Sequence, residues 1–279
     1  MIVCGGDGTI NEAVNGLALT KTRLGILPGG TANIIARELG LPLDLVTAAR
    51  ELPGWRPRAV PLGLATWSTG VDTKTDIAPP SCGSQSPRPE SSGGAEAPPF
   101  RGLFQDPAKS TESRRYFLSV GGIGFDAHVI DQLKHHFKRF LGAWAYGLEA
   151  ARQVTRYGFP PFICRADGKQ MVAGFAAIQR TSRYGGWFRM APGARFFEPR
   201  LKVCLFRSRR WQRYLVYAAA LVARRHPQLA DVAVIETERV ECSPGEPGAR
   251  ILFEVDGELS GALPARFEVV PDAVTLLTP

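Results

Sequence analysis

The chain reads GGDGT at residues 5–9, directly after a short apolar run, and INEAVNGL at residues 10–17. Apolar residues of the second segment recur at i, i+3, i+4 and i+7, the spacing of one helix face. A strand, a glycine turn and a helix N-terminus therefore follow one another. Glycines let backbone N–H groups approach an anion, and the helix adds unpaired donors and the positive end of its dipole. The sequence predicts a phosphate-binding corner, whose natural guest is a nucleoside triphosphate.

Asp7 lies inside this predicted anion site. A carboxylate beside phosphates is tolerated where Mg²⁺ lies between them or where the carboxylate handles a proton. Asp7 therefore indicates catalysis. The alternative is a β-hairpin, because Gly-Gly-Asp-Gly is also a common turn sequence. A hairpin would need a second strand after the turn, and the pattern that follows is helical.

A second unit of the same kind follows the first. The apolar run LGIL at 24–27 leads into PGGTAN at 28–33, and a helical segment at 34–39 ends before Gly40 and Pro42. Two successive units of strand, glycine turn and helix predict an α/β fold with a mostly parallel sheet, which binds ligands at the carboxyl ends of its strands. Thr9 and Thr31 are then expected to line one crevice.

Length and composition indicate a two-domain enzyme without a membrane span. The chain has 279 residues and a mass of 30.3 kDa, enough for two ordinary domains. Its five cysteines are scattered, odd in number and without a CxxC pair, so neither a disulfide framework nor a zinc site is expected, and a cytoplasmic location fits best. The longest apolar run, 214–223, is far shorter than the roughly 20 residues that a spanning helix needs.

Positive charge is clustered in three segments, 134–139, 207–213 and 224–226, and the formal net charge is +8. A basic surface with interleaved aromatic residues suits anionic lipid headgroups, nucleic acid or a nucleotide substrate. A solvated basic face without any partner has the same composition. Charge alone does not distinguish these alternatives.

The rest of the chain predicts a second, β-rich domain. Residues 72–113 are rich in Pro, Gly, Ser, Thr and Glu and are expected to form a disordered insertion within a hairpin. Beyond residue 115, many short strand-like segments predict a β-sandwich, with helices at 127–156, where Gly142 is a candidate break, and at 211–224. The expected domains are therefore 1–58, an α/β nucleotide-binding domain, and 59–279, a β-sandwich whose last strand can return to the first domain.

Together with LPGGTAN at 27–33, the GGDGT corner resembles the diacylglycerol kinase catalytic-domain superfamily. The resemblance is to the bacterial soluble lipid kinases, which are similar to sphingosine and ceramide kinases and more distantly to NAD kinases and 6-phosphofructokinases. Later motifs extend it: 119–127 (SVGGIGFDA), 184–186 (YGG), 190–194 (MAPGA), 255–258 (VDGE) and 269–273 (VVPDA).

This resemblance implies that the γ-phosphoryl group of ATP is transferred, with Mg²⁺, to the hydroxyl of diacylglycerol or a sphingoid-like lipid. Glu258 would accept the hydroxyl proton, with Asp256 beside it, and Asp7 would act at the metal and phosphates. The residues that would contact ATP are Gly5, Gly6, Asp7, Gly8, Thr9, Ile10, Asn11, Glu12, Gly30 and Thr31.

The chemistry of the Asp256-Gly257-Glu258 segment is consistent with that role. A carboxylate is a weak base in water, but two acids one residue apart in a cleft raise one another's proton affinity. On spacing alone, an exposed β-turn is the alternative. The family resemblance favours the catalytic interpretation.

The chain departs from the family pattern at three places. The usual first strand, with its Asn-Pro and glycine turn, does not precede Met1, so a truncated N-terminal domain with an incomplete ATP pocket is expected. Asn33 is followed by Ile34 where the family has Asp. Where bacterial relatives hold a structural Mg²⁺, the chain has RFFEPR at 195–200, in which Glu198 is the candidate ligand and the proline and arginines oppose it.

Three functions follow from these features. A lipid kinase acting at a membrane surface is the first, an NAD kinase sharing the glycine corner is the second, and a catalytically silent nucleotide- or lipid-binding remnant is the third. Segments 133–146 and 211–225 are candidates for contact with anionic headgroups, the alternative being that they pack on their own domain. A cytoplasmic protein with peripheral contact at the inner membrane surface and no nucleic-acid partner is expected.

Overall fold

The computed structural model describes residues 1–68, 112–136, 142–184 and 188–279. The elements of its N-terminal part are β1 (Ile2–Gly5), α1 (Asp7–Leu17), β2 (Arg23–Pro28), α2 (Ile34–Leu39), α3 (Leu45–Glu51) and a 3-10 turn at Leu52–Gly54. Strands β1 and β2 are parallel, with Val3 opposite Ile26. Their buried residues pack against the apolar face of α1, where Ile10 and Val14 are fully buried. The predicted helical period of α1 therefore produces the first core.

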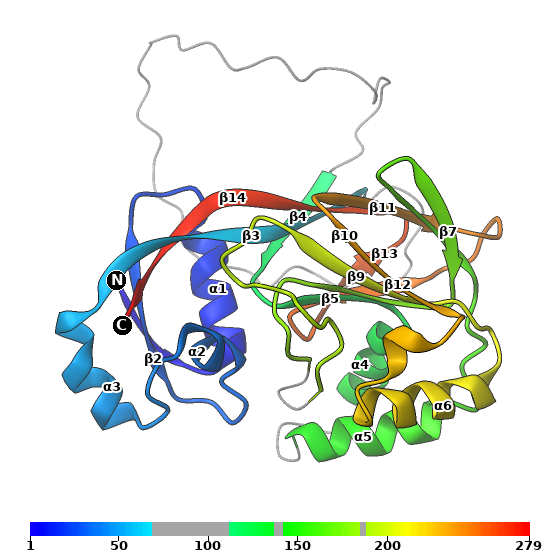
Figure 1. The fold of residues 1–279 in the computed structure, drawn as a ribbon, viewed down its shortest axis with the longest axis horizontal. Coiled ribbons are helices and arrows are strands. Elements are labelled where there is room, and N and C mark those ends of the chain that lie inside the picture. Colours follow the sequence, from blue (N-terminus) through cyan, green and yellow to red (C-terminus); the bar gives the residue numbers. More distant parts are fainter. Residues whose placement is uncertain (69–111, 137–141, 185–187) are drawn as a thin grey trace, which may run out of the picture. The chain divides into compact units, whose positions relative to one another are not determined.

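Two long strands, β3 (Arg56–Ser68) and β14 (Ala265–Thr278), run from these N-terminal elements into the C-terminal part (Figure 1). They pair with each other in antiparallel fashion over most of their length. Strand β14 also pairs in parallel with β2, where Leu276 lies opposite Leu24. The last strand of the chain thus completes the N-terminal sheet.

The two long strands belong to an eight-stranded sheet of order β1-β2-β14-β11-β6-β7, in which β3 pairs with β14 and β4 with β3. Its parallel pairs are β1 with β2 and β2 with β14, whereas β14 is antiparallel to both β3 and β11. The sheet is therefore mixed, and the expectation of a mostly parallel sheet is wrong beyond the pairs among β1, β2 and β14. Its remaining strands are β4 (Glu112–Phe117), β6 (Phe162–Ala166), β7 (Lys169–Ala173) and β11 (Arg239–Pro244).

A six-stranded sheet of order β10-β9-β8-β5-β12-β13 is antiparallel throughout. One hydrophobic core joins residues of this sheet to residues of the eight-stranded sheet. Within that core the rings of Phe253 and Phe267 meet edge-on, 5.4 Å apart. The strands are β5 (Val120–Gly124), β8 (Phe175–Gln179), β9 (Leu201–Phe206), β10 (Val232–Thr237), β12 (Leu252–Val255) and β13 (Glu258–Ala262).

Helices α4 (Phe125–His136), α5 (Gly142–Gln153) and α6 (Trp211–Val222) accompany the six-stranded sheet (Figure 1). A third core joins α6, Phe125 at the start of α4 and Val154 just after α5 to the sheet. In it Tyr214 of α6 stacks on Phe159, with ring centroids 3.7 Å apart, and Tyr217 packs against Phe206 of β9. Within the described residues, no helix is long and apolar enough to cross a membrane.

Several predicted boundaries differ from the structure. Segments 267–270 and 274–277 are parts of one strand, β14, whose register shifts between Val270 and Val274. Most of the predicted insertion, 72–113, lies outside the described residues, and its last two residues belong to β4. The predicted domain boundary at 58 and 59 falls within β3 and remains a prediction.

Candidate active site

The glycine corner forms where β1 ends and α1 begins. Gly6 is the N-cap of α1, and its carbonyl accepts the first helical bond, from the Ile10 N–H at 3.0 Å. The first N–H groups of a helix have no partner within the helix, so they remain available to an anion. Thr9 is exposed, and its side chain lies over Gly5, where an added Cβ would be 2.7 Å from the Thr9 Cβ. The corner thus exposes backbone donors and one hydroxyl.

The second glycine turn lies directly against the first. The Gly29 N–H donates to the Gly5 carbonyl at 2.9 Å. A Cβ on Gly30 would lie 2.5 Å from the Cα of Gly6, well inside van der Waals contact. Only glycine permits this backbone approach at residue 30, so the two turns form one continuous surface of peptide groups.

Asn33 fixes the second turn. Its side chain accepts from the Gly30 N–H at 2.9 Å and donates to the Gly30 carbonyl at 2.8 Å. The residue has a left-handed backbone, with φ of 48°, which asparagine tolerates better than most residues. It is also nearly fully buried. Its neighbour Thr31 is exposed beside the corner.

Asp7 connects the two turns. Its carboxylate Oδ1 accepts a hydrogen bond from the Ile35 N–H, in the first turn of α2, at 3.1 Å. The acid that the sequence places in the first corner is therefore also held by the helix that follows the second. A carboxylate in this position can bind a cation that accompanies phosphates.

Asp256 is a half-buried anchor in the turn between β12 and β13. Its carboxylate accepts from the backbone N–H groups of Leu118, Ser119 and Val120, at 2.7, 2.8 and 2.9 Å. Burial, with a smaller contribution from the negative charge of Asp7, raises the pKa of Asp256 to about 6, although the three N–H donors act in the opposite direction. Asp256 therefore holds the turn in place from the inside.

Glu258, the first residue of β13, lies beside α1. Its Oε1 would be 3.9 Å from a Cβ placed on Gly8, so the carboxylate borders the first turn of that helix. Its Oε2 accepts from Arg115 Nη2 at 2.6 Å, and the same nitrogen also pairs with Glu12 of α1. The Glu258 side chain is 41% exposed, which leaves it open to a substrate.

A second acid supports this turn. The Glu254 carboxylate accepts from the Gly257 N–H at 2.6 Å. Both Glu254 and Asp126, at the start of α4, are almost fully buried. Burial, followed by the charge of Asp126 and a hydrogen bond with its carboxyl group, raises the pKa of Glu254 well above its usual value. One proton shared between these two carboxyl groups is the arrangement that such a pair favours.

Two domain families match the chain: the diacylglycerol kinase catalytic domain over residues 1–65, and the YegS C-terminal NAD kinase beta sandwich-like domain over residues 119–278. The second match alone covers more than half of the chain. The chain belongs to the bacterial diacylglycerol kinase and YegS-like lipid kinase family.

Relatives in this family are distant. A diacylglycerol kinase of Mycobacterium tuberculosis is 26% identical over 286 residues, which cover 100% of this chain and 76% of that protein. A diacylglycerol kinase of Bacillus subtilis is 24% identical, with 96% of this chain and 73% of the relative covered. A solved structure from Bacillus anthracis has a TM-score of 0.65 at 20% identity, covering 100% of this chain and 77% of its own, and supports the fold alone.

Apart from Glu198, the structure brings the predicted residues of this lipid-kinase family member to one place, with two qualifications. The side chain of Ile10 is fully buried in the N-terminal core. Asn11 is buried as well, and with its amide in the favoured orientation it donates to the Tyr116 carbonyl at 3.2 Å and to Asp256 at 3.3 Å. Both residues can offer only backbone groups to a nucleotide, and their contact with ATP remains a prediction.

Glu198 is the predicted residue that does not fit its role. Its carboxylate pairs with Arg195 at 2.7 Å, and the described parts of the chain contain no group of three His, Cys, Asp or Glu side chains able to hold a metal. A single exposed carboxylate neutralised by an arginine is a poor Mg²⁺ site. The residues around Glu198 therefore do not match the expected structural metal site.

Sequence reasoning missed Arg115. It precedes a predicted strand, and nothing local distinguishes it from Arg114, but its partner Glu258 is 143 positions away in the chain. Only the pairing of distant strands brings these residues together. The one signal in the sequence is charge: Arg115 is a positive residue beside a predicted strand, and the predicted proton acceptor is an acid that could pair with it.

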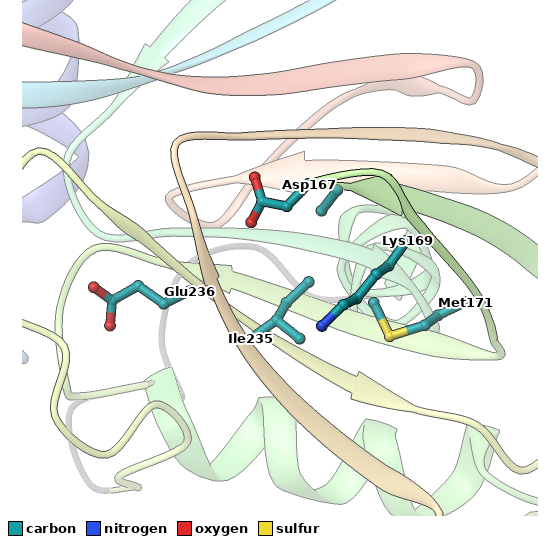
Figure 2. A pocket seen from close by; sticks show the side chains of 6 residues that line it. Asp167, Lys169, Met171, Ile235 and Glu236 are labelled. Atoms are coloured by element: carbon teal, nitrogen blue, oxygen red, sulfur yellow. The ribbon is translucent and has the colours of Figure 1, made fainter.

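A separate hollow of about 190 Å³ lies away from these residues, in the C-terminal part (Figure 2). It contains none of the predicted site residues. Its lining consists of Ala166, Asp167, Lys169, Met171, Ile235 and Glu236.

Proposed function

We propose that this protein transfers the γ-phosphoryl group of ATP to the hydroxyl group of a lipid, either diacylglycerol or a sphingoid-like lipid. The observation that supports this proposal best is the position of Glu258, whose carboxylate borders the first turn of α1 next to Gly8. A phosphate held by the N–H groups of that turn would lie within reach of this carboxylate. Phosphoryl transfer requires little more than positioning, charge neutralisation and a proton acceptor.

The two glycine turns are the nucleotide-binding part of the proposed site. Backbone N–H groups at Gly6 and Gly8 and the hydroxyls of Thr9 and Thr31 would bind the phosphates, and Gly30 would let the second turn lie against the first. Asp7 would hold the Mg²⁺ that accompanies ATP, and the ion would offset the negative charge between this carboxylate and the phosphates. Asn33 keeps the second turn in its binding geometry.

Glu258 would act as the general base. As the lipid oxygen forms its bond to the γ-phosphorus, the bond from phosphorus to the β–γ bridging oxygen breaks and ADP leaves. The proton of the lipid hydroxyl passes to the Glu258 carboxylate. Arg115 holds that carboxylate in place, and Asp256 and Glu254 fix the turn before it through four backbone N–H groups.

A lipid acceptor is supported by the relatives that span nearly all of this chain, which are diacylglycerol kinases. Such an acceptor resides in a bilayer, so the kinase would work by peripheral contact at the inner membrane surface, from the cytoplasmic side. An NAD kinase and an inactive remnant are the alternatives that one experiment must separate from a lipid kinase.

The decisive experiment measures transfer of radiolabelled phosphate from ATP to a lipid panel and, in parallel, to NAD. We expect a labelled lipid and no labelled NAD. Glu258→Gln removes the proton acceptor but keeps an oxygen for Arg115, so kcat should fall at least about 100-fold, the usual contribution of a general base.

Glu51→Gln, at an exposed residue of α3, is the matched control and should leave kcat unchanged. Full activity of Glu258→Gln would exclude this residue as the base. Label on NAD alone would identify an NAD kinase, and no transfer to any acceptor would favour the remnant.

A further inference from the structure

The solvent-facing side of α6 is apolar, which is unusual for a surface helix. Its inner side carries Tyr214 and Tyr217, both buried against the sandwich. Residues on the outer side of the helix recur at i, i+4, i+7 and i+11. In a surface helix, such solvent-facing positions normally carry charged or polar side chains. The large apolar residues there are Trp211, Leu215, Val216 and Val222, with exposures of 37%, 53%, 42% and 70%.

The rest of this outer face is equally without charge. Between Arg213 and Arg224 the helix exposes only apolar side chains, and Ala218 and Ala219 fill the space between the larger residues. Single exposed apolar residues need no explanation, but a continuous stripe along a whole helix marks a contact surface. We call these outer residues, together with the arginines described next, the α6 surface.

Arginines flank the stripe at both ends, and residues 207–230 contain no Asp or Glu. Arg213 pairs with Asp231 beneath the helix, at 2.7 Å, and Arg209 pairs with Glu246 at 3.2 Å. The flanking arginines are exposed in the structure: Arg207, Arg209, Arg210, Arg224 and Arg225. The surface therefore combines an apolar centre with cationic ends.

This combination selects among the possible occupants. Nucleic acid would use the arginines but would leave Leu215 and Val222 in contact with water or phosphate. A second copy of the chain would cover the apolar stripe, but a two-fold contact would bring arginine-rich ends together. An anionic bilayer complements both features, because apolar side chains enter the acyl boundary while arginines meet lipid phosphates.

We propose that the α6 surface binds the face of a bilayer containing anionic lipid. This inference deepens the proposed function and rests on it for its biological meaning, since a kinase for a bilayer lipid must reach its acceptor. The binding itself depends only on the residues of α6 and its flanks. Trp211, at the N-terminal end of the stripe, would lie at the headgroup level, where tryptophan is favoured.

The test measures co-sedimentation with vesicles that contain no acceptor lipid. Vesicles of equal parts phosphatidylcholine and phosphatidylglycerol are compared with pure phosphatidylcholine, using the full chain. We expect binding to the anionic vesicles that weakens with added salt, as screening requires. The double variant Leu215→Asp/Val222→Asp should bind at least about tenfold less, and Arg224→Ala/Arg225→Ala should bind less at low salt only.

Val46→Asp is the matched control, because Val46 is an exposed valine (55%) on a different helix, α3. It should leave vesicle binding unchanged. Because both residues of the double variant face solvent, its circular dichroism and melting temperature should match those of the unsubstituted protein, which excludes misfolding as the cause of lost binding. Equal vesicle binding by the double variant and the unsubstituted protein would overturn the proposal.

Two further outcomes would also overturn it. One is a dimer in solution that dissociates in the double variant while neither protein binds vesicles. The other is binding of random-sequence duplex DNA in place of vesicles. An assay with a short-chain acceptor lipid dispersed in water separates this proposal from the kinase assignment. The double variant should phosphorylate this lipid normally. If the unsubstituted protein does not phosphorylate it, that result counts against the kinase function alone.

Discussion

Arg115 is the residue at which the two ends of the candidate site meet. Its Nη2 contacts carboxylates from α1 and from β13, and its side chain is only 19% exposed. An arginine between two acids neutralises charge that would otherwise repel incoming phosphates. It also restricts Glu258 to one position, and positioning accounts for much of the rate in phosphoryl transfer.

We expect Arg115→Ala to lower kcat for lipid phosphorylation at least tenfold. Stability should fall by no more than about 1 kcal/mol, because partly exposed ion pairs contribute little. Arg115→Lys keeps the charge but loses the fixed fork geometry, so it should recover part of kcat. Steady-state kinetics with ATP, combined with urea unfolding, separates the two effects.

Arg114→Ala is the neighbouring control, since Arg114 is exposed on the same strand. It should alter kcat by less than twofold. An Arg115→Ala enzyme with unchanged kcat, or one that loses activity only because it unfolds, would contradict the positioning role.

Among the elements, the contact between the two glycine turns offers the sharpest test of the nucleotide site. Gly30→Ala would place a methyl group 2.5 Å from the Gly6 Cα, and neither atom belongs to a flexible side chain. The turns must move apart, so the N–H groups of the first turn and the Thr31 hydroxyl of the second no longer converge on one anion. We expect the Kd for ATP, measured by isothermal titration, to rise at least tenfold, or about 1.4 kcal/mol.

The adjacent substitution is the control for this prediction. A Cβ on Gly29 would lie 3.4 Å from the Gly5 backbone, an ordinary contact distance. Gly29→Ala should therefore bind ATP with nearly unchanged affinity. If both substitutions weaken binding equally, the close approach at residue 30 is not what shapes the site.

The elements also show how far sequence reasoning reaches. The corner at β1 and α1 was predictable because its chemistry is local: glycines, one acid and a helical period within 13 residues, 5–17. Helix α6 was predictable for the same reason. Strand β13 was not, because its sequence, ELSGA, lacks the alternation of apolar and polar residues that marks a half-buried strand.

Pairing between strands far apart in the chain explains the remaining differences between the predicted and the observed strands. Segments 267–270 and 274–277 look like two strands because Pro271 and Asp272 separate them, and Asp272 has a φ of 47°. The structure continues one strand through this irregularity because β3 pairs with it on both sides. Parallel pairing of β14 with β2 depends on residues some 250 positions apart, which no local pattern reports. The contacts of Arg115 belong to the same class.

At the scale of the whole molecule, the site depends on a buried acidic network below the Asp256 turn. Asp256 and Glu254 together accept four backbone N–H groups that fix this turn. The buried Arg180 guanidinium, which donates to the Phe196 carbonyl at 2.6 Å, interacts favourably with Asp256. The free energy of unfolding therefore depends on pH, because these acids are easier to bury when they are protonated than when they are charged.

The direction of the pKa shifts determines whether the free energy of unfolding rises or falls with pH. Glu254 has a raised pKa in the folded state, so between its usual value of 4.5 and that raised value the folded protein holds a proton that the unfolded chain has released. Its contribution to the free energy of unfolding is complete below 4.5 and is lost as pH rises. Asp256 has the same effect, because its pKa is raised from its usual value of 3.8 to about 6 in the folded protein. The loss amounts to about 1.4 kcal/mol for each pH unit and each such group.

Glu254→Gln tests this network directly. Glutamine resembles the protonated acid: its oxygen can accept from the Gly257 N–H, and its amide can donate to Asp126, but it cannot lose the proton. We expect the variant to gain stability relative to the unsubstituted protein as pH rises above 4.5, by roughly 1 kcal/mol per unit. Urea unfolding at several pH values gives this difference, in which the general effect of net charge cancels. Glu51→Gln, at an exposed residue, should show a stability difference that does not depend on pH. The same pH-independent difference for Glu254→Gln would mean that Glu254 holds no proton below the Asp256 turn.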